Sequence, residues 1–373
     1  MALGPRDSAS LVQLTGWDAT ELRNTQLQDG TNFAAIVTQM NSALGALNAE
    51  LTSDPLWSSL VTYTDTPDLE YRTGASNGFE RFTEYGRPDS KRAETEGHML
   101  PLMAFDRGLG WTWDYLRKAR FSQVQADIAD AIKDARDIWR VRLLTRLLKR
   151  GDDSGAINGL GSSGLSPGFA TTAASTGVDF TPPAYGGNTF ASTHEHYVGI
   201  AGGAYTNAVF SDVKAELREH GHEPSYNFIA SPSDEATITG LTDFVPVPKT
   251  NVAYGNNTSL ASIAMDSVAP GIYPIGVISD SVVWIVPGMP QYYGFGWKPY
   301  GPNSQRNPLA VRLQKGESRP TVTAFPDPRS GAGAVYPLQY MMLFLEFGVG
   351  VNDRTNGTAR YVNSATWADG TPT

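Results

Sequence analysis

The clearest pattern in the chain is a run of apolar residues at helical spacing between positions 119 and 150. Apolar side chains recur there every three or four residues, which predicts an amphipathic helix. The repeating positions are Phe121, Val124, Ile128, Ala131, Ile132, Ala135, Ile138, Trp139, Leu143 and Leu147. No glycine or proline interrupts the run, and Gly151 is a natural stop. At 1.5 Å per residue the helix would be about 45 Å long, which is long for a globular domain.

A second helical pattern lies near the N-terminus. Asp29-Gly30-Thr31 is a helix start signal, and apolar residues then recur at helical spacing until Asp54-Pro55. These positions are Phe33, Ile36, Val37, Met40, Leu44, Leu47 and Leu51. Two interpretations are open: the helix packs on its own domain, or residues 1–55 form an arm that reaches over a neighbouring subunit.

Residues 56–116 have the pattern of extended strands. The predicted strands are Val61–Tyr63, Tyr71–Thr73, Phe79–Tyr85, His98–Phe105 and Trp111–Tyr115. A polar segment of mixed charge separates them, and its charged residues are Arg87, Asp89, Lys91, Arg92, Glu94 and Glu96. A hairpin with such a charged tip and no opposing apolar sheet needs another surface on which to lie.

The second half of the chain predicts a compact α/β unit and closing strands. Residues 190–325 predict a helix at Ala204–His220 and a short helix that Ser231 caps. The expected strands are Tyr226–Ala230, Ile275–Ile278, Val282–Val286, Leu309–Leu313, Tyr340–Val351 and Thr358–Val362. The turn between the last two contains Asn356-Gly357, which is a hairpin signal. Residues 151–189 are rich in glycine and serine and predict an excursion between subdomains. The fold class is therefore α+β.

Composition narrows the class of protein. The 373 residues carry a net charge of −9, and only 18% of them are charged. Acidity argues against a conventional DNA-binding module, but not against a container for DNA. Cysteine is absent, which excludes disulfides and thiolate chemistry. The N-terminus lacks the pattern of a signal peptide, and apolar runs such as Met341–Phe347 are too short to span a bilayer.

The five histidines are candidate metal ligands. His194-Glu195-His196 is an HxH pair, and His220-Gly221-His222-Glu223 is a second cluster. A cupin-type site would need a downstream glutamate at short spacing, and residues 197–203 supply none. His220 ends a helix, where the dipole favours a positive residue. We therefore expect a structural role, with one histidine buried and hydrogen-bonded, and no metal site.

Basic residues gather at the end of the long predicted helix. They are Arg140, Arg142, Arg146, Lys149 and Arg150. The position suits the negative end of the helix dipole and makes a local basic patch. Such a patch either contacts phosphates without reading sequence, or pairs with acids of neighbouring subunits or of an internal scaffold.

Other chemical motifs fail their structural context. Gly159–Gly164 matches GxGxxG by letters, but no strand precedes it and no helix follows. A Gly-x-Ser-x-Gly elbow is absent. The aromatic residues near Tyr292–Tyr300 suggest either a carbohydrate platform or packing around turns, and packing is favoured. We expect no catalytic or cofactor site.

The order of elements resembles the Hong Kong 97-type fold of tailed-phage major capsid proteins. More specific similarity to capsid proteins of phages that infect actinobacteria lies in two regions. They are His194–Tyr197 with Ala215–Gly221, Phe228–Ala230 and Ile238–Leu241, and Tyr336–Leu338 to Gly348–Val351 with Arg354 and Gly357 following. The resemblance covers most of the chain from about Thr83 to Trp367.

The resemblance implies a role for each segment. Residues 1–55 would be the N-terminal arm, and 56–116 the extended loop that lies on an adjacent subunit through its charged residues. Residues 117–189 and 326–373 would form the peripheral domain, with 119–150 as its spine helix and the basic helix end facing the lumen. Residues 190–325 would be the axial domain. Asp353 and Arg354 would make contacts at the closing hairpin.

The resemblance also implies partners. Copies of the chain would form hexamers and pentamers of an icosahedral shell, assembled in a bacterial cytoplasm around double-stranded DNA, with scaffolding, portal and decoration proteins and no membrane. Some relatives crosslink a loop lysine to an asparagine, for which Lys91 with Asn352 or Asn356 is a hypothesis. We expect no cleaved N-terminal segment. An encapsulin-type nanocompartment and a carbohydrate-active β-rich protein are the alternatives.

Overall fold

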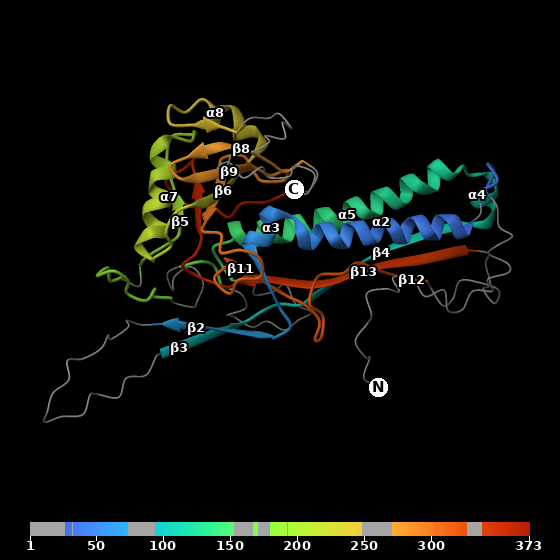
Figure 1. The fold of residues 1–373 in the computed structure, drawn as a ribbon, viewed down its shortest axis with the longest axis horizontal. Helices are drawn as coiled ribbons and strands as arrows, with labels where there is room; N and C mark the ends of the chain where they lie inside the picture. The colour runs from blue at the N-terminus through green and yellow to red at the C-terminus, as the bar shows by residue number, and fades with distance from the viewer. Residues whose placement is uncertain are drawn as a thin grey trace, which may run out of the picture. The chain divides into compact units, whose positions relative to one another are not determined.

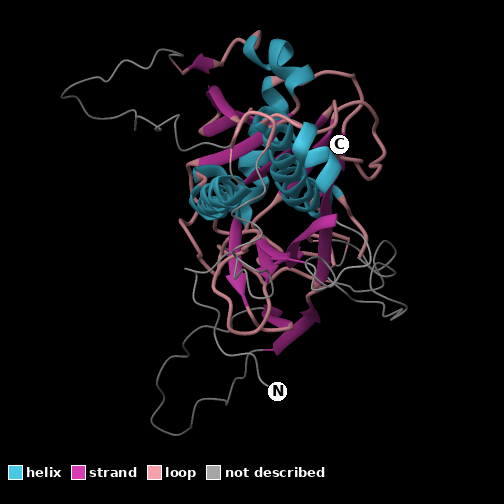
Figure 2. Ribbon diagram, turned by 90° about the vertical axis from the view of Figure 1, so that its right-hand side faces the viewer, coloured by secondary structure: helices cyan, strands magenta, loops and turns pink. Residues whose placement is uncertain are grey.

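The computed structural model describes residues 27–31, 33–73, 94–152, 167–170, 180–191, 193–247, 271–326 and 338–373. They divide into two compact units. One comprises the described parts of 1–53, 102–140 and 313–348, and the other those of 54–101, 141–312 and 349–373. Both units combine helices with strands, which Figure 2 distinguishes by colour. Within the described residues, no helix has both the length and the apolar character needed to cross a membrane.

The first unit packs two helices against three antiparallel strands. The helices are α2 (Phe33–Ser53) and the first part of α5 (Phe121–Leu148), which run side by side over the strands (Figure 1). Strand β13 (Leu338–Val351) is central, with β12 (Thr323–Pro326) on one side and β4 (Met103–Thr112) on the other. Its register with β4 runs from Leu338 opposite Thr112 to Phe347 opposite Met103.

Helix α2 buries the apolar face that its sequence predicts. Ile36, Met40, Leu44, Leu47 and Leu51 are all buried. Asn48, on the same helix, joins its amide to the backbone of Val322 through two hydrogen bonds of 3.2 and 2.8 Å. The helix therefore packs on its own unit, as the first of the two interpretations expects. Residues 1–26 of the predicted arm lie outside the described residues.

Helix α5 confirms the long helix predicted from the apolar repeat. Val124, Ile128 and Ala131 are buried in the first unit, and the Trp139 ring lies 5.0 Å from that of Phe347. Arg136 binds Glu50 of α2 through two hydrogen bonds of 2.7 Å. Because the pair is made through two parallel hydrogen bonds, it fixes the rotation of α5 against α2.

The second unit is built on a seven-stranded mixed sheet. Its strand order is β5-β14-β10-β6-β9-β8-β7. The strands are β5 (Tyr197–Gly199), β14 (Thr358–Tyr361), β10 (Tyr293–Trp297), β6 (Tyr226–Ala230), β9 (Ser281–Ile285), β8 (Tyr273–Ile278) and β7 (Val245–Pro246).

Helix α7 (Asn207–Glu219) provides much of this unit's core. It lies beside the sheet in Figure 1 and buries Val209, Phe210, Val213 and Leu217 against strands β6, β8 and β9. The short helices η1 (Pro232–Asp234) and α8 (Glu235–Thr239) follow β6, and Ser231 caps the first of them as predicted. The apolar residues that predicted the helix at 204–220 thus lie on the side of α7 that faces the core.

A short helix and two strand pairs complete the second unit. Helix α3 (Pro55–Leu60) leads into β1 (Val61–Thr64), which pairs in parallel with β11 (Leu309–Arg312). Strands β2 (Asp68–Thr73) and β3 (Glu94–Met99) form an antiparallel pair, with Asp68 opposite Met99 and Thr73 opposite Glu94. The base of the predicted charged hairpin is therefore present.

Three sequence predictions need correction. Strands β13 and β14 do not form a hairpin: β13 pairs with β4 and β12, whereas β14 pairs with β10 and β5. The segment 113–115 is not a strand but opens α4 (Trp113–Lys118), because the Thr112 hydroxyl caps it by accepting from the Tyr115 amide. The aromatic run 292–300, for which the sequence predicted turns and no strand, contains β10, all of whose residues are buried.

Candidate functional sites

The charged hairpin is described only at its base. Arg87, Asp89, Lys91 and Arg92 lie outside the described residues. Glu94 and Glu96 are on β3, opposite Thr73 and Tyr71 of β2. The pair is tight at Gly97, where a Cβ would lie 2.9 Å from the Leu69 carbonyl oxygen. The inter-subunit role of these charged residues stays a prediction.

The basic end of α5 is engaged within the chain. Arg140 pairs with Asp137 at 2.8 Å, and Arg150 lies 3.5 Å from the Glu195 carboxylate. Arg146 is buried and donates to the carbonyl oxygens of Lys149 and Gly151. Arg142 and Lys149 are half-buried. These side chains therefore do not form one open basic surface, and contact with DNA remains a prediction.

Arg354 is a second buried arginine. It is 1% exposed, its Nε donates to the Gly168 carbonyl at 2.9 Å, and its guanidinium lies 4.4 Å from the centre of the Phe180 ring. Asp353 accepts from the backbone and hydroxyl of Thr355. Arg146 and Arg354, called here the arginine pair, hold carbonyls on the two sides of the Gly/Ser-rich segment. Arg146 binds Gly151 before it, and Arg354 binds Gly168 after it.

The structure brings three histidines from two separate segments together. His194 and His196 precede or adjoin β5, and His220 caps the C-terminus of α7. Their Nε2 atoms form a triangle with sides of 3.0 Å (194 to 196), 2.9 Å (194 to 220) and 2.9 Å (196 to 220). We call these three residues the histidine cluster. His196 is fully buried, and its Nδ1 lies 2.7 Å from the Gly357 carbonyl oxygen.

Two carboxylates of α7 face the histidine cluster. Glu219 Oε1 lies 3.3 Å from His194 Nε2 and 3.6 Å from His220 Nε2. Glu216 Oε1 lies 4.0 Å from His196 Nε2, while its Oε2 accepts from the Thr358 hydroxyl at 2.7 Å and from Arg360. Helical spacing places these residues on one face, because positions i, i+3 and i+4 lie together.

Burial sets the protonation of the histidine cluster. It lowers the pKa of His196 to about 4 and that of His220 to about 2, and it also lowers the pKa of His194. The Arg360 charge acts in the same direction on the pKa of His196, whereas the Glu216 carboxylate opposes it. The three rings are therefore neutral at pH 7. Burial, reinforced by Glu216, raises the pKa of Glu219.

The remaining histidines lie apart from this cluster. His222 Nδ1 is 2.8 Å from the Tyr300 hydroxyl, and its Nε2 is 3.0 Å from the Thr355 hydroxyl. His98, buried in β3, has its pKa lowered to about 4 by burial and then by the positive charge of Arg354. Of the two neighbours His220 and His222, only His220 therefore lies with His194 and His196.

Sequence reasoning did not group Glu216 and Glu219 with the histidines. It correctly expected one histidine to be buried and hydrogen-bonded, which His196 is. The available signal was Glu216, Glu219 and His220 at spacing i, i+3 and i+4 on one predicted helix. Only the fold shows that this face meets the HxH segment.

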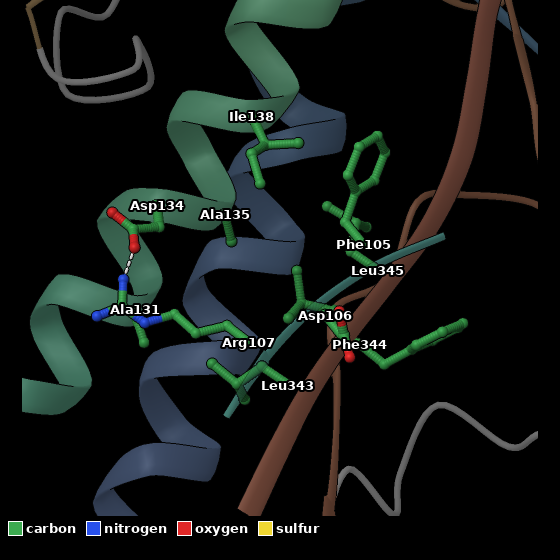
Figure 3. A pocket seen from close by; sticks show the side chains of 11 residues that line it. Phe105, Asp106, Arg107, Ala131, Asp134, Ala135, Ile138, Leu343, Phe344 and Leu345 are labelled. Atoms are coloured by element: carbon green, nitrogen blue, oxygen red, sulfur yellow. Dashed lines mark ion pairs between the residues drawn. The ribbon is translucent and has the colours of Figure 1, made fainter. Parts of the chain in front are cut away.

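A small cavity in the first unit has a different character. It lies between α5, β4 and β13 and is lined by apolar side chains that include Ala135, Ile138, Phe105 and Leu345 (Figure 3). The Arg107–Asp134 ion pair stands at its margin. A volume of about 30 Å³ holds about one water molecule. This cavity is therefore a packing feature, too small for an organic ligand.

The aromatic run 292–300 also belongs to the core. Trp297 and Phe295 on β10 are fully buried, and Tyr293 stacks on Tyr361 at 4.5 Å. Trp367 meets Tyr293 edge-on at 5.7 Å. Packing, which the sequence interpretation favoured, therefore accounts for these rings.

Comparison with known proteins places the fold. No known protein-family profile matches the chain, and no curated protein matches it in sequence. The chain is similar to a solved structure from Mycobacterium phage Patience, with a TM-score of 0.62 and 19% identity, over 98% of this chain and 97% of that one. The predicted α+β fold, and the resemblance to proteins of actinobacterial phages, are confirmed at the level of the fold.

The chain is also similar, more weakly, to two capsid structures. One is the capsid of an empty GTA particle, at a TM-score of 0.47 and 13% identity over 84% of this chain and 90% of that one. The other is the capsid of Cyanophage P-SCSP1u, at a TM-score of 0.49 and 9% identity over 82% of this chain and 86% of that one. TM-scores below 0.5 are too low to define a shared fold.

Proposed function

We propose that this chain is the major capsid protein of a tailed phage and that its copies assemble into an icosahedral shell around double-stranded DNA. The observation that carries the proposal is the fold shared with the phage Patience structure along almost the whole of both chains. Because a fold alone does not define a function, the proposal also rests on features of the chain that suit assembly.

The β2–β3 pair is the first such feature. It is a separate two-stranded sheet with no third strand among the described residues. Met99, at the end of β3, is 54% exposed. An isolated two-stranded hairpin is marginal in water, so a surface of a neighbouring copy would stabilise it. The charged loop residues would then give register to this contact more than affinity.

The acidic balance is the second feature. With a net charge of −9, a shell of this chain would enclose DNA without binding it tightly. Arg140, Arg146 and Arg150 already pair or bond within the chain. Any contact with packaged DNA would therefore be weak and non-specific. Hexamers, pentamers, and scaffolding, portal and decoration proteins belong to the same proposal.

Electron microscopy of the full-length chain, expressed alone and with its neighbouring genes, tests the proposal. We expect closed shells, or tubes and five- or six-membered rings. A uniform monomer under both conditions would overturn the assembly proposal. The absorbance ratio of purified particles then distinguishes nucleic acid from the enzyme cargo of a nanocompartment.

Charge reversal at the hairpin tip sharpens this test. The double variant Lys91→Glu with Arg92→Glu should leave the subunit folded and should make assembly fail or depend strongly on salt. The matched control reverses two exposed cations elsewhere, Lys315→Glu with Arg319→Glu, and so makes the same change in net charge. Normal particle yield from the hairpin variant would contradict a contact through this tip.

A further inference from the structure

Hydrogen bonds alone do not satisfy the histidine cluster. An imidazole nitrogen has one bonding direction, either as an N–H donor or as a lone-pair acceptor. The Gly357 carbonyl can only accept, so the Nδ1 of His196 carries the hydrogen and its Nε2 presents a lone pair to the cluster. If the other two Nε2 atoms both carried hydrogens, these would face each other across 2.9 Å. If only one of the two carried a hydrogen, that hydrogen could bond well to only one of the other two Nε2 atoms, and the remaining lone pair would have no donor.

We propose that His194, His196 and His220 bind one divalent transition-metal ion, with zinc as the preferred ion and Glu219 as a fourth ligand. Three neutral imidazoles and one carboxylate are a donor set that zinc uses in proteins. The four residues each offer one ligand atom, and these atoms all lie within 4.8 Å of one another. This site is independent of the proposed capsid function and differs from the sequence-based expectation that the histidines bind no metal.

The distances suit a first-row ion. Zinc–nitrogen bonds of 2.0–2.1 Å place donor atoms about 3.3 Å apart in a tetrahedral site. The three nitrogens are 2.9–3.0 Å apart, and Glu219 Oε1 is 3.3 and 3.6 Å from two of them. An ion about 2.05 Å from each nitrogen would lie roughly 1.2 Å out of their plane. Small side-chain rotations would complete the coordination.

The surroundings hold the ligands in place. The Gly357 carbonyl orients His196, in the manner of the outer-shell partners of known metal-bound histidines. The Phe190 ring lies 4.9 Å from the His194 ring and 4.3 Å from the His220 ring, and so covers one side. The Gly357 position is itself constrained, since a Cβ there would lie 2.5 Å from Phe295.

The electrostatics favour a cation at this point. Glu216 and Glu219 supply negative charge, and the Arg360 guanidinium is bound by Glu216. Nearby, Arg150 is paired with Glu195.

The bound ion would crosslink two segments far apart in sequence. His194 and His196 belong to the segment that leads into the edge strand β5, whereas His220 and Glu219 end α7. The ion would fix this edge of the seven-stranded sheet to the helix that covers it. Since all four positions would be taken by protein ligands, the site would be structural.

Titration of the full-length chain with Zn²⁺, after removal of metal with a chelator, tests the proposal. We expect one ion per chain by calorimetry. Co²⁺ should give the intense visible absorption of a four-coordinate ion, which distinguishes the site from surface binding of hydrated Co²⁺. His194→Gln should weaken Zn²⁺ binding by at least about 100-fold, and Glu219→Gln by about 10-fold or more.

The matched control is Glu195→Gln, which lies between two of the ligands but pairs with Arg150. It should bind Zn²⁺ as the parent chain does. Failure of the parent chain to bind, or parent-like binding by His194→Gln, would overturn the proposal and leave a purely hydrogen-bonded cluster. Should His194→Gln not fold, the Co²⁺ spectrum of the parent chain decides: a weak six-coordinate spectrum would contradict the site.

Discussion

The arginine pair and the histidine cluster are two buried polar centres of the same unit. Their side chains differ in charge and in the atoms that they contact. Arg146 and Arg354 remain charged under all conditions, and each bonds fixed backbone carbonyls. The three histidines are neutral, and their Nε2 atoms point toward one another. The arginines use their N–H groups in hydrogen bonds to the backbone, whereas the histidines have nitrogen lone pairs that remain available to a ligand.

The partners of a buried polar group separate structural groups from ligand-binding ones. A buried group whose partners are backbone atoms serves the fold, because its removal leaves those atoms unsatisfied. Buried groups whose lone pairs converge serve a ligand, because no arrangement of protein hydrogens satisfies them all. By this criterion Arg354 has a structural role, whereas the family resemblance implies a contact role for it at the closing hairpin.

The largest effect should come from the arginine pair. Arg354→Met keeps much of the side-chain volume but leaves the Gly168 carbonyl without its donor. We expect the free energy of unfolding to fall by about 3 kcal/mol, measured by urea unfolding of the unassembled full-length chain. The exposed Arg319→Met is the control and should change it by less than about 0.5 kcal/mol. Equal losses for the two variants would mean that the buried hydrogen bonds of Arg354 do not stabilise the fold.

A smaller effect should appear in the pH dependence through His98, which borders the arginine pair. Its pKa is lowered to about 4 in the fold, against about 6.5 when unfolded. Between these values the unfolded chain binds the proton first, so stability falls as the pH drops from 6.5 toward 4. His98→Gln should remove roughly 2 to 3 kcal/mol of this loss near pH 4.

Urea unfolding of both proteins at several pH values from 7 to 4.5 measures this contribution. The comparison with the parent chain cancels the titration of the other histidines. Parallel curves for the two proteins would mean that His98 is not the group responsible.

The smallest effect should come from the partly exposed end of α5. Arg150→Ala removes a pair with Glu195 in which both side chains are about a third exposed. Such pairs contribute at most about 1 kcal/mol. Arg146→Ala, four residues earlier and buried, should cost several times more. If thermal unfolding shows equal losses for the two variants, burial does not explain which basic residues of this helix end matter.

Local patterns predicted most elements but not their partners. The apolar repeats of α2, α5 and α7 were readable because each helix buries one continuous face. Strand β10 was missed because Gly294 and Gly296 replace the side chains that mark a strand. Those glycines are needed where Phe228 packs, since a Cβ at Gly294 would lie 2.2 Å from its ring. Such a close approach is a property of the neighbour, which the local sequence does not contain.

The sites follow the same rule. The histidine cluster depends on β5 pairing with β14, which brings the HxH segment beside α7. The Asn356-Gly357 turn predicted a hairpin from local preference, but β10 and β4 compete for the two strands and separate them. Long-range pairing therefore overrides turn chemistry at this point.

The same turn has a consequence for the chemical lifetime of the protein. In an Asn-Gly sequence the glycine nitrogen can attack the asparagine side chain, and the amide is lost as ammonia; thermolabile asparagines age proteins in this way. Here the Asn356 amide is buried and donates to the carbonyls of Lys298 and Arg306, while its oxygen accepts from the Lys298 amide. A side chain held on both atoms cannot turn toward the glycine nitrogen, so this link should resist ageing for as long as the fold is intact.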